Sequence, residues 1–296
     1  MTSENGRGAV LITGASTGIG KATAKHLDGL GFRVFATVRN KSDAQALEAA
    51  SSDRLKAILM DVTDEASIHS ASEEVRRVTA DAGLAGLVNN AGVGFSVPLE
   101  FVPLDEVRWL FEVNVFGLLA VTQAFLPMLR QAQGRIVNVS STASHIVAPF
   151  HGPYSASKLS VNGLSDALRL ELRPFNVSVS VIICGSIKTP IWEKGGALTE
   201  RVTKEFRPQA WELYGEAFGK LGDYFTGLGE RGKAPETAAG VIAEALTSKR
   251  PRQTYLVGPD ARLNNIIHRL FSGRMRDWAV LRMTGVYKNS SPQRPG

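Results

Sequence analysis

The sequence predicts a single α/β domain with a doubly wound parallel sheet of seven strands, helices on both faces and a C-terminal helical extension. Short segments rich in Val and Ile alternate with longer amphipathic segments, which is the pattern of buried parallel strands and their crossover helices. The first strand ends in a glycine-rich turn. The chain has 296 residues, of which 44% are hydrophobic and 21% charged, so it can bury one large core.

The alternation is regular along most of the chain. Strands are predicted at 8–13, 32–38, 55–60, 86–89, 135–140, 177–183 and 254–257. Helices are predicted from about 22 to 29 and at 43–50, 64–80, 104–131, 154–174 and 235–248. Residues 190–233 form a long insertion, and connections of this length are usually functional or disordered. Residues 260–283 continue with a helical pattern, so we expect a domain over 1–260 that includes the insertion and an extension over 261–296.

Composition argues against several classes of protein. Cys184 is the only cysteine, so no intrachain disulfide or thiolate metal site is expected, as in a reducing compartment. The five histidines lack metal-binding spacing, and we expect no metal. The start of the chain has no apolar signal segment, and no later apolar run reaches the roughly eighteen residues of a membrane span. We therefore expect a cytoplasmic protein.

The net charge of +6 is unevenly distributed. From Lys249 onward, ten Lys and Arg face two Asp and Glu, which leaves 24 against 26 in residues 1–248. The near-neutral domain is not expected to bind nucleic acid. Residues 262–282 combine apolar side chains with arginines, as in a basic amphipathic helix that binds an anionic membrane peripherally. The same helix is equally suited to cover a sheet edge or a subunit interface of a homodimer or homotetramer.

The turn after the first strand indicates a nucleotide-binding site. It has the sequence TGASTGIG (13–20) and opens a helix, so its backbone N–H groups and the positive helix N-terminus can hold a pyrophosphate. An ordinary tight turn is the alternative, because a glycine-rich turn alone is weakly specific. The residues expected to contact the cofactor here are Gly14, Ser16, Thr17, Gly18, Ile19 and Gly20.

The ends of the next two strands predict which nucleotide is bound. An acidic residue that binds a free ribose 2′-hydroxyl is usual after the second strand, but the chain has Val38 and then Arg39. An arginine beside a 2′-phosphate contributes about 1.5–3 kcal/mol, which favours NADP(H) over NAD(H); a solvated arginine is the alternative. Asp61, followed by Val62, ends the third strand and is expected to bind the adenine amino group, unless it caps the helix that starts near Asp64.

Tyr154 and Lys158 carry the predicted proton chemistry. Their i,i+4 spacing places the phenol and the ammonium on one face of a helix. A phenol has an ordinary pKa of about 10, and a nearby cation favours its phenolate form. Two residues at this spacing occur often by chance, so the pair counts only in combination with other motifs.

The combination resembles the short-chain dehydrogenase/reductase family in order and spacing, over about residues 7–190. The matching residues are TGxxxGIG at 13–20, NNAG at 89–92, Asn114, Ser141, Tyr154 and Lys158. The resemblance implies a single Rossmann domain in which Tyr154 is the general acid/base. It also implies that Ser141 binds the substrate oxygen, that Lys158 binds the nicotinamide ribose and lowers the tyrosine pKa, and that Asn114 anchors a water. A buried asparagine that satisfies helix backbone is the alternative for Asn114.

The resemblance assigns further contacts and shows one departure. Asn90, Ala91 and Gly92 would line the cofactor, and Ile187 and Thr189 would meet the carboxamide. The family commonly has Pro-Gly after the sixth strand, where this chain has Cys184-Gly185, so the rigidity of this loop is in doubt. Cys184 is expected to be a packing residue. On the substrate side we expect Ser141, Tyr154, His145 and Gly185, with His151 also close to the mouth.

The insertion indicates the character of the substrate. It holds seven aromatic residues: Trp192, Phe206, Trp211, Tyr214, Phe218, Tyr224 and Phe225. Because the family covers its substrate with this segment, a lipophilic steroid-like or retinoid-like substrate is favoured, with aromatic packing on the core as the alternative. We therefore expect an NADP(H)-dependent oxidoreductase of lipophilic alcohols, ketones or aldehydes. A reductase of small carbonyl compounds and a cofactor-binding regulatory or scaffold protein with an unused active site are the competing hypotheses.

Overall fold

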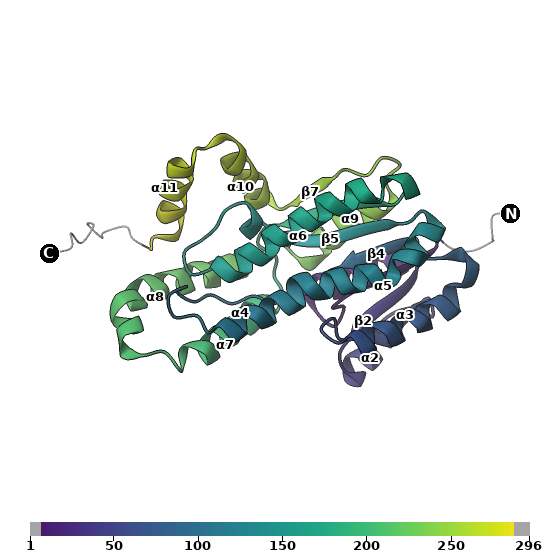
Figure 1. The fold of residues 1–296 in the computed structure, drawn as a ribbon, viewed down its shortest axis with the longest axis horizontal. Helices are drawn as coiled ribbons and strands as arrows, with labels where there is room; N and C mark the ends of the chain where they lie inside the picture. Colours follow the sequence, from purple (N-terminus) through teal and green to yellow (C-terminus); the bar gives the residue numbers. More distant parts are fainter. Residues whose placement is uncertain (1–6, 287–296) are drawn as a thin grey trace.

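The computed structural model describes residues 7–286, which form a seven-stranded, all-parallel sheet in the order β3-β2-β1-β4-β5-β6-β7. The chain winds outward from β1 to β3, returns, and winds outward again from β4 to β7, as predicted (Figure 1). The strands are β1 Ala9–Ile12, β2 Arg33–Val38, β3 Leu55–Leu59, β4 Gly86–Asn89, β5 Arg135–Ser141, β6 Ser178–Cys184 and β7 Thr254–Val257. The direction of winding changes between β1 and β4, where doubly wound sheets bind ligands.

Helices cover both faces of the sheet. Helices α1 (Gly18–Gly29) and α9 (Pro235–Thr247) lie side by side on one core cluster with α2 (Lys41–Glu48) at its edge, and α3 (Glu65–Thr79) and α5 (Gly117–Ala132) cover the opposite cluster. The long α6 (Gly152–Glu171) packs against β5 and β6. Figure 1 shows α5 and α6 running across the sheet. Parallel strands are therefore buried on both sides, which explains their continuous apolar sequences.

The helix predicted at 104–131 is divided by a π-helical turn. Helix α4 (Leu104–Phe111) is followed by the turn Glu112–Phe116 and then by α5. Single π turns are frequent at functional sites, and this one contains Asn114. The whole stretch Leu104–Ala132 is long and apolar enough to cross a membrane, contrary to the expectation that no segment is. Within this stretch 44% of the apolar window is buried, and Val121, Phe125 and Leu129 of α5 pack fully buried in the core, so we assign α5 to the core of the fold.

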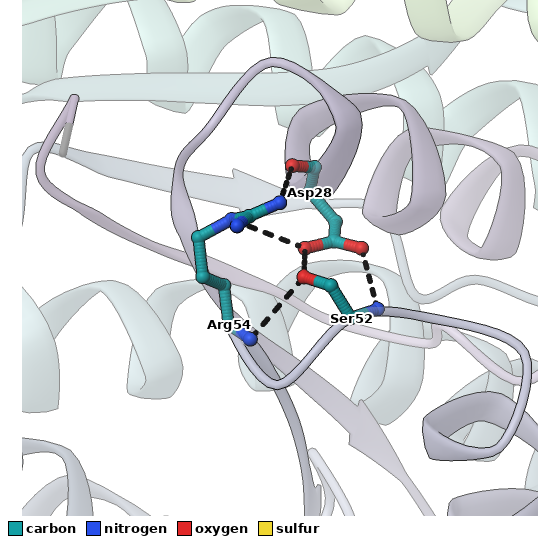
Figure 2. A network of polar contacts seen from close by, with 3 residues as sticks. All are labelled: Asp28, Ser52 and Arg54. Carbon is teal, nitrogen blue, oxygen red and sulfur yellow. Dashed lines mark hydrogen bonds and ion pairs between the residues drawn. The ribbon is translucent and has the colours of Figure 1, made fainter. Parts of the chain in front are cut away.

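A buried carboxylate ties the end of α1 to the loop before β3 (Figure 2). Asp28 accepts hydrogen bonds from the Ser52 N–H at 2.9 Å and from the Ser52 hydroxyl. The Arg54 guanidinium donates to the Asp28 carbonyl at 3.2 Å and lies 3.6 Å from its carboxylate. Asp28 is 6% exposed, so these bonds replace the water that its charge would otherwise require.

The insertion and the extension are both helical. The insertion folds into α7 (Ile191–Thr203) and α8 (Pro208–Arg231). The single helix expected over 262–282 is wrong, because the extension forms α10 (Pro259–Leu270) and α11 (Gly273–Thr284) with an extended break at Phe271 and Ser272. Serine and glycine are poor helix formers, and here they follow each other at 272–273. Figure 1 shows both helices at one end of the molecule, with α11 close to α8.

Candidate active site

The glycine-rich turn between β1 and α1 requires glycine at positions 14, 18 and 20. Gly14 and Gly18 have φ of 65° and 57°, the left-handed region that favours glycine. A Cβ at Gly20 would collide with the Gly14 carbonyl. Asn90 fixes the turn, because its Nδ2 donates to the carbonyls of Thr13 at 2.9 Å and Gly14 at 3.1 Å. The structure thus brings Asn90 and Ala91 against the turn, and their contact with a cofactor stays a prediction.

The N-terminus of α1 leaves backbone donors open toward this turn. Thr17 occupies the N-cap position, yet its side chain makes no capping hydrogen bond. The first N–H groups of a helix have no intrahelical acceptor, and they favour a negatively charged ligand. The turn and the helix end therefore fit a dinucleotide pyrophosphate, and Ser16, Thr17, Gly18 and Ile19 lie where it would bind.

The loop after β6 lies against the same turn. A Cβ at Gly18 would be 3.0 Å from Cγ2 of Thr189, so the two segments are in contact. Ile187 is 3% exposed and packs in the core, and its carbonyl accepts a 2.7 Å hydrogen bond from Trp192 Nε1. Thr189 is therefore placed to meet a cofactor with its side chain, whereas Ile187 could do so only through its backbone.

Arg39 and Asp61 lie at the ends of β2 and β3. Arg39 is exposed, and it makes no hydrogen bond or ion pair within residues 7–286. Asp61 Oδ1 accepts from the Thr63 N–H at 2.9 Å and from the Thr63 hydroxyl at 2.8 Å, while Asp64 caps α3. Asp61 therefore closes a turn, and Val62 packs beside it against the core. The adenine contact of Asp61 stays a prediction.

Ser141, Tyr154 and Lys158 meet at the carboxyl end of β5. Ser141 ends the strand, and its side chain hydrogen-bonds that of Tyr154 on the first turn of α6. The Lys158 ammonium lies 5.8 Å from the centre of the Tyr154 ring and donates to the Val139 carbonyl at 3.1 Å. The Tyr154 ring packs directly against Gly94, where any side chain would clash, because a Cβ there would lie 2.9 Å from Cδ2 of Tyr154.

Burial sets the charge of these groups. It raises the pKa of Tyr154 to about 12, although the hydrogen bond with Ser141 lowers it, and the phenol is protonated at neutral pH. Burial lowers the pKa of Lys158 to about 8. Burial also raises the pKa of Cys184 to about 12, so this residue is a buried thiol, as its expected packing role requires. The site thus holds a proton donor next to a cation that loses its proton readily.

Asn114 is buried in the π-helical turn with its amide fully engaged. Its Oδ1 accepts from the Val93 N–H at 2.8 Å, and its Nδ2 donates to the Val93 carbonyl at 2.8 Å and to Ser157 Oγ at 3.0 Å. These bonds match the alternative expectation of a buried asparagine that satisfies backbone. A Cβ at Gly92 would lie 3.3 Å from Asn114 Oδ1 and 3.4 Å from Lys158 Nζ, so the two residues face one space. The water-anchoring role stays a prediction.

His145 and Gly185, both expected on the substrate side, lie against residues of α10. The His145 ring stacks on His268 of α10 at 4.7 Å, and none of its hydrogen bonds or ring contacts within residues 7–286 is to Tyr154. Gly185 faces the Asp260 carboxylate at the start of α10, which would collide with any side chain there. Asp260 Oδ2 accepts from the Ser186 N–H at 2.6 Å. The substrate role of these two residues stays a prediction.

His151, which was expected close to the substrate mouth together with His145, lies beside the phenol. Its ring centre lies 4.7 Å from that of Tyr154 and 4.9 Å from that of Phe225, whose ring is 6.2 Å from Trp192. Its position one helical turn before Tyr154 was a signal for this contact. No sequence signal identified Asp260, because its partners are 74 residues away in the chain.

The seven aromatic residues of the insertion divide into two groups. Trp192, Tyr224 and Phe225 form a chain of ring contacts that reaches His151. The other four, Phe206, Trp211, Tyr214 and Phe218, contact one another or Phe101 and Phe150. The second group fits the packing interpretation, and Tyr224 and Phe225 also pack on a core cluster; the contact of the first group with a substrate stays a prediction.

Comparison with known proteins gives consistent matches. A family model described as short chain dehydrogenase matches residues 8–197. The NADPH-dependent 3-dehydrocapnine reductase of Ornithobacterium rhinotracheale is 36% identical over 275 residues, which covers 90% of this chain and 94% of that protein. The 17-beta-hydroxysteroid dehydrogenase type 6 of Rattus norvegicus is 40% identical over 266 residues, covering 86% and 81%. The crystal structure of a short-chain dehydrogenase from Streptomyces avermitilis has a TM-score of 0.75 at 28% identity, covering 98% and 100%.

Proposed function

Because the chain belongs to the short-chain dehydrogenase family and has its Rossmann-type fold, it is an oxidoreductase, and we propose that it uses NADP(H) on lipophilic alcohols, ketones or aldehydes. The observation that carries this proposal is the placement of Tyr154. Its phenol hydrogen-bonds Ser141, and the buried Lys158 lies beside its ring. A proton donor held at this end of the sheet, next to a turn that fits a dinucleotide, has the parts of a carbonyl reductase site.

The residues at the turn fit the dinucleotide, and Arg39 supports the choice of NADP(H). Gly14, Gly18 and Gly20 would admit the pyrophosphate, and Thr189 would contact the nicotinamide end. Arg39 is exposed and without a partner in residues 7–286, so its charge is available to a 2′-phosphate. The name of the Ornithobacterium relative includes NADPH dependence, which agrees with this proposal. When bound, the cofactor supplies or accepts the hydride.

The proton is moved by the chain's own residues. In reduction, the Tyr154 phenol donates its proton to the substrate oxygen, and Ser141 Oγ hydrogen-bonds the same oxygen and holds it near the phenol. Lys158 stabilises the phenolate that remains, as long as it keeps its own proton. In oxidation the same groups act in reverse. The balance between the charges of Tyr154 and Lys158 therefore sets the direction that a given pH favours.

The walls of the site favour a lipophilic substrate. His151, Phe225 and Trp192 follow one another outward from Tyr154 through ring contacts. The two relatives act, by their names, on dehydrocapnine and on a hydroxysteroid. Apolar walls with a few polar groups are typical of sites for such ligands.

The outer face of the extension supports a further proposal, peripheral contact with an anionic membrane. Ile267, Val280 and Val286 bury the inner face of the extension, while Leu270 and Trp278 are 76% and 62% exposed. The exposed arginines are Arg262, Arg269, Arg274 and Arg282, and Arg282 lies 5.6 Å from the centre of the Trp278 ring. Arginine, tryptophan and leucine together are typical of surfaces that bind the interface of anionic bilayers.

Vesicle co-sedimentation tests this contact. The full chain should pellet with phosphatidylserine vesicles and stay in solution with phosphatidylcholine vesicles. Substituting Leu270→Ser and Trp278→Ser together should abolish pelleting, while Trp211→Ser, an exposed tryptophan on α8, should leave it unchanged. Equal pelleting of both variants would overturn the contact.

Turnover tests the enzymatic proposal against its rival, a cofactor-binding protein with an unused active site. NADPH absorbance is followed with ketosteroids, retinal and simple aldehydes for the wild-type chain and for Tyr154→Phe. The proposal expects oxidation with at least one lipophilic carbonyl compound and a loss of about 100-fold or more in the variant. Preference for the simple aldehydes would support the small-carbonyl alternative, and equal traces for both proteins would support the rival.

A further inference from the structure

His151 lies between the catalytic phenol and the aromatic wall of the site. It precedes α6, three residues before Tyr154, and its ring is tilted by 51° to the Tyr154 ring and by 50° to the Phe225 ring. The proposed mechanism makes no use of this imidazole. An imidazole is polar, so its place in an otherwise aromatic wall is unexplained by packing alone.

One hydrogen bond to the ring and two to its neighbours hold the segment around His151. Its Nδ1 is 2.8 Å from the Ser96 hydroxyl. The Ser96 N–H in turn donates to Thr199 Oγ1 on α7 at 3.0 Å. The preceding Phe150 has φ of 62°, in the left-handed region that non-glycine residues rarely adopt, and its carbonyl accepts from the Val97 N–H at 2.7 Å. Segments from three parts of the chain therefore hold the ring in one position.

The other ring nitrogen is available to a ligand. Nε2 makes no hydrogen bond within residues 7–286, yet it is not sealed from solvent in the way that Nδ1 of His145 is. Burial lowers the pKa of His151 to about 4, so the imidazole is neutral at physiological pH. Ser96 can donate to Nδ1 or accept from it, which leaves Nε2 as a donor in one case and an acceptor in the other. A hydroxyl group pairs with either form.

We infer that His151 Nε2 binds a hydroxyl group of the substrate, adjacent to the carbon that is oxidised or reduced. The inference rests on the proposed function and makes it more specific. The ring centres of His151 and Tyr154 are 4.7 Å apart, so one small polar group beside the reacting carbonyl can meet the imidazole while the carbonyl meets the phenol. The preferred substrate is then an apolar chain or ring system with a hydroxyl next to its carbonyl, and His151 is the residue that selects it.

Two matched ketones test this selection. The full chain is assayed with NADPH and either 2-dodecanone or 1-hydroxy-2-dodecanone. We expect kcat/KM to be about 10- to 100-fold higher for the hydroxyketone, because a site that binds a hydroxyl discriminates against a substrate without it. His151→Phe keeps a ring against Tyr154 and Phe225 but has no nitrogen. It should lose the preference, so that its kcat/KM values for the two ketones agree within about threefold.

Two further variants separate recognition from stability. His151→Gln, which can donate and accept, should restore part of the preference even if the Phe variant unfolds at a lower temperature. His145→Phe, the other histidine close to the site, should keep the full preference.

Each other outcome has a separate meaning. Equal kcat/KM for the two ketones in the wild type, or an equal loss for both in His151→Phe and His151→Gln, overturns the role of His151 and leaves the proposed function standing. Failure of the wild-type chain to reduce any carbonyl compound while it binds NADPH would overturn both.

Discussion

The loop that follows β6 depends on a carboxylate from the extension. The resembling family commonly has proline there, and this chain has Cys184 instead. Asp260 supplies a different restraint, because its Oδ2 accepts from the Ser186 N–H at 2.6 Å and its Oδ1 from the Ala261 N–H at 3.0 Å. We predict that Asp260→Ala loosens the loop and weakens cofactor binding.

The magnitude follows from these bonds. A hydrogen bond to a charged group contributes about 1.5–3 kcal/mol, and the carboxylate at the start of α10 adds about 0.3–1 kcal/mol. The free energy of unfolding should therefore fall by about 2–4 kcal/mol in urea titrations. Because Thr189 on this loop contacts the glycine turn, the Kd of NADPH should rise about tenfold, which equals about 1.4 kcal/mol.

The control is Asp277→Ala, which removes an exposed carboxylate of α11 from the same extension. Asp260→Asn keeps a neutral acceptor and should lie between the wild type and the Ala variant. NADPH fluorescence and urea unfolding are measured on all four proteins. If Asp260→Ala and Asp277→Ala shift both quantities alike, the restraint is not Asp260 and the reasoning fails.

Three further predictions concern the cofactor, the pH and the fold. Arg39→Ala should raise the Kd of NADPH about 10- to 100-fold and leave that of NADH within about twofold. An unchanged ratio of the two Kd values would show that Arg39 does not bind the 2′-phosphate. Since burial lowers the pKa of Lys158 to about 8, kcat/KM for reduction should fall as pH rises through about 8, and a profile flat to pH 10 would contradict this. The same shift affects stability, because below about pH 8 the folded protein holds Lys158 as a buried charge. The free energy of unfolding should therefore rise with pH between about 8 and the ordinary lysine pKa of about 10.4. Asp28→Ala should lower the free energy of unfolding by about 2–3 kcal/mol relative to the exposed control Asp53→Ala, and equal melting of the two would contradict the role of the Ser52 and Arg54 contacts.

The sequence was sufficient to predict the sheet, because strand and helix periods follow from local apolar patterns. Helix α1 begins at Gly18, within the predicted glycine turn, and the seven strands lie at the predicted places. Tyr154, Ser141 and Lys158 came together as expected, since the carboxyl end of β5 and the start of α6 are close in the chain.

Contacts over long sequence distances were out of reach. The His145–His268 stack and the Asp260–Ser186 bond depend on where α10 packs, and that packing leaves no period in the sequence. The break at Phe271 and Ser272 was missed for a related reason, because apolar residues recur at helical spacing on both sides of it. The π turn was also missed, since it alters the hydrogen bonds of the helix without altering its apolar pattern.

The π turn at Glu112–Phe116 makes the length of this helix as important as its composition. A π turn holds one residue more than an α turn, so winding the same residues into a regular α-helix would rotate α4 by about 100° relative to α5. Leu110, which is fully buried, would leave its cluster with Phe95 and Val202, while Asn114 would lose its two bonds to Val93. The π geometry of these five residues therefore sets the orientation of α4, and with it the positions of Leu110 and Asn114.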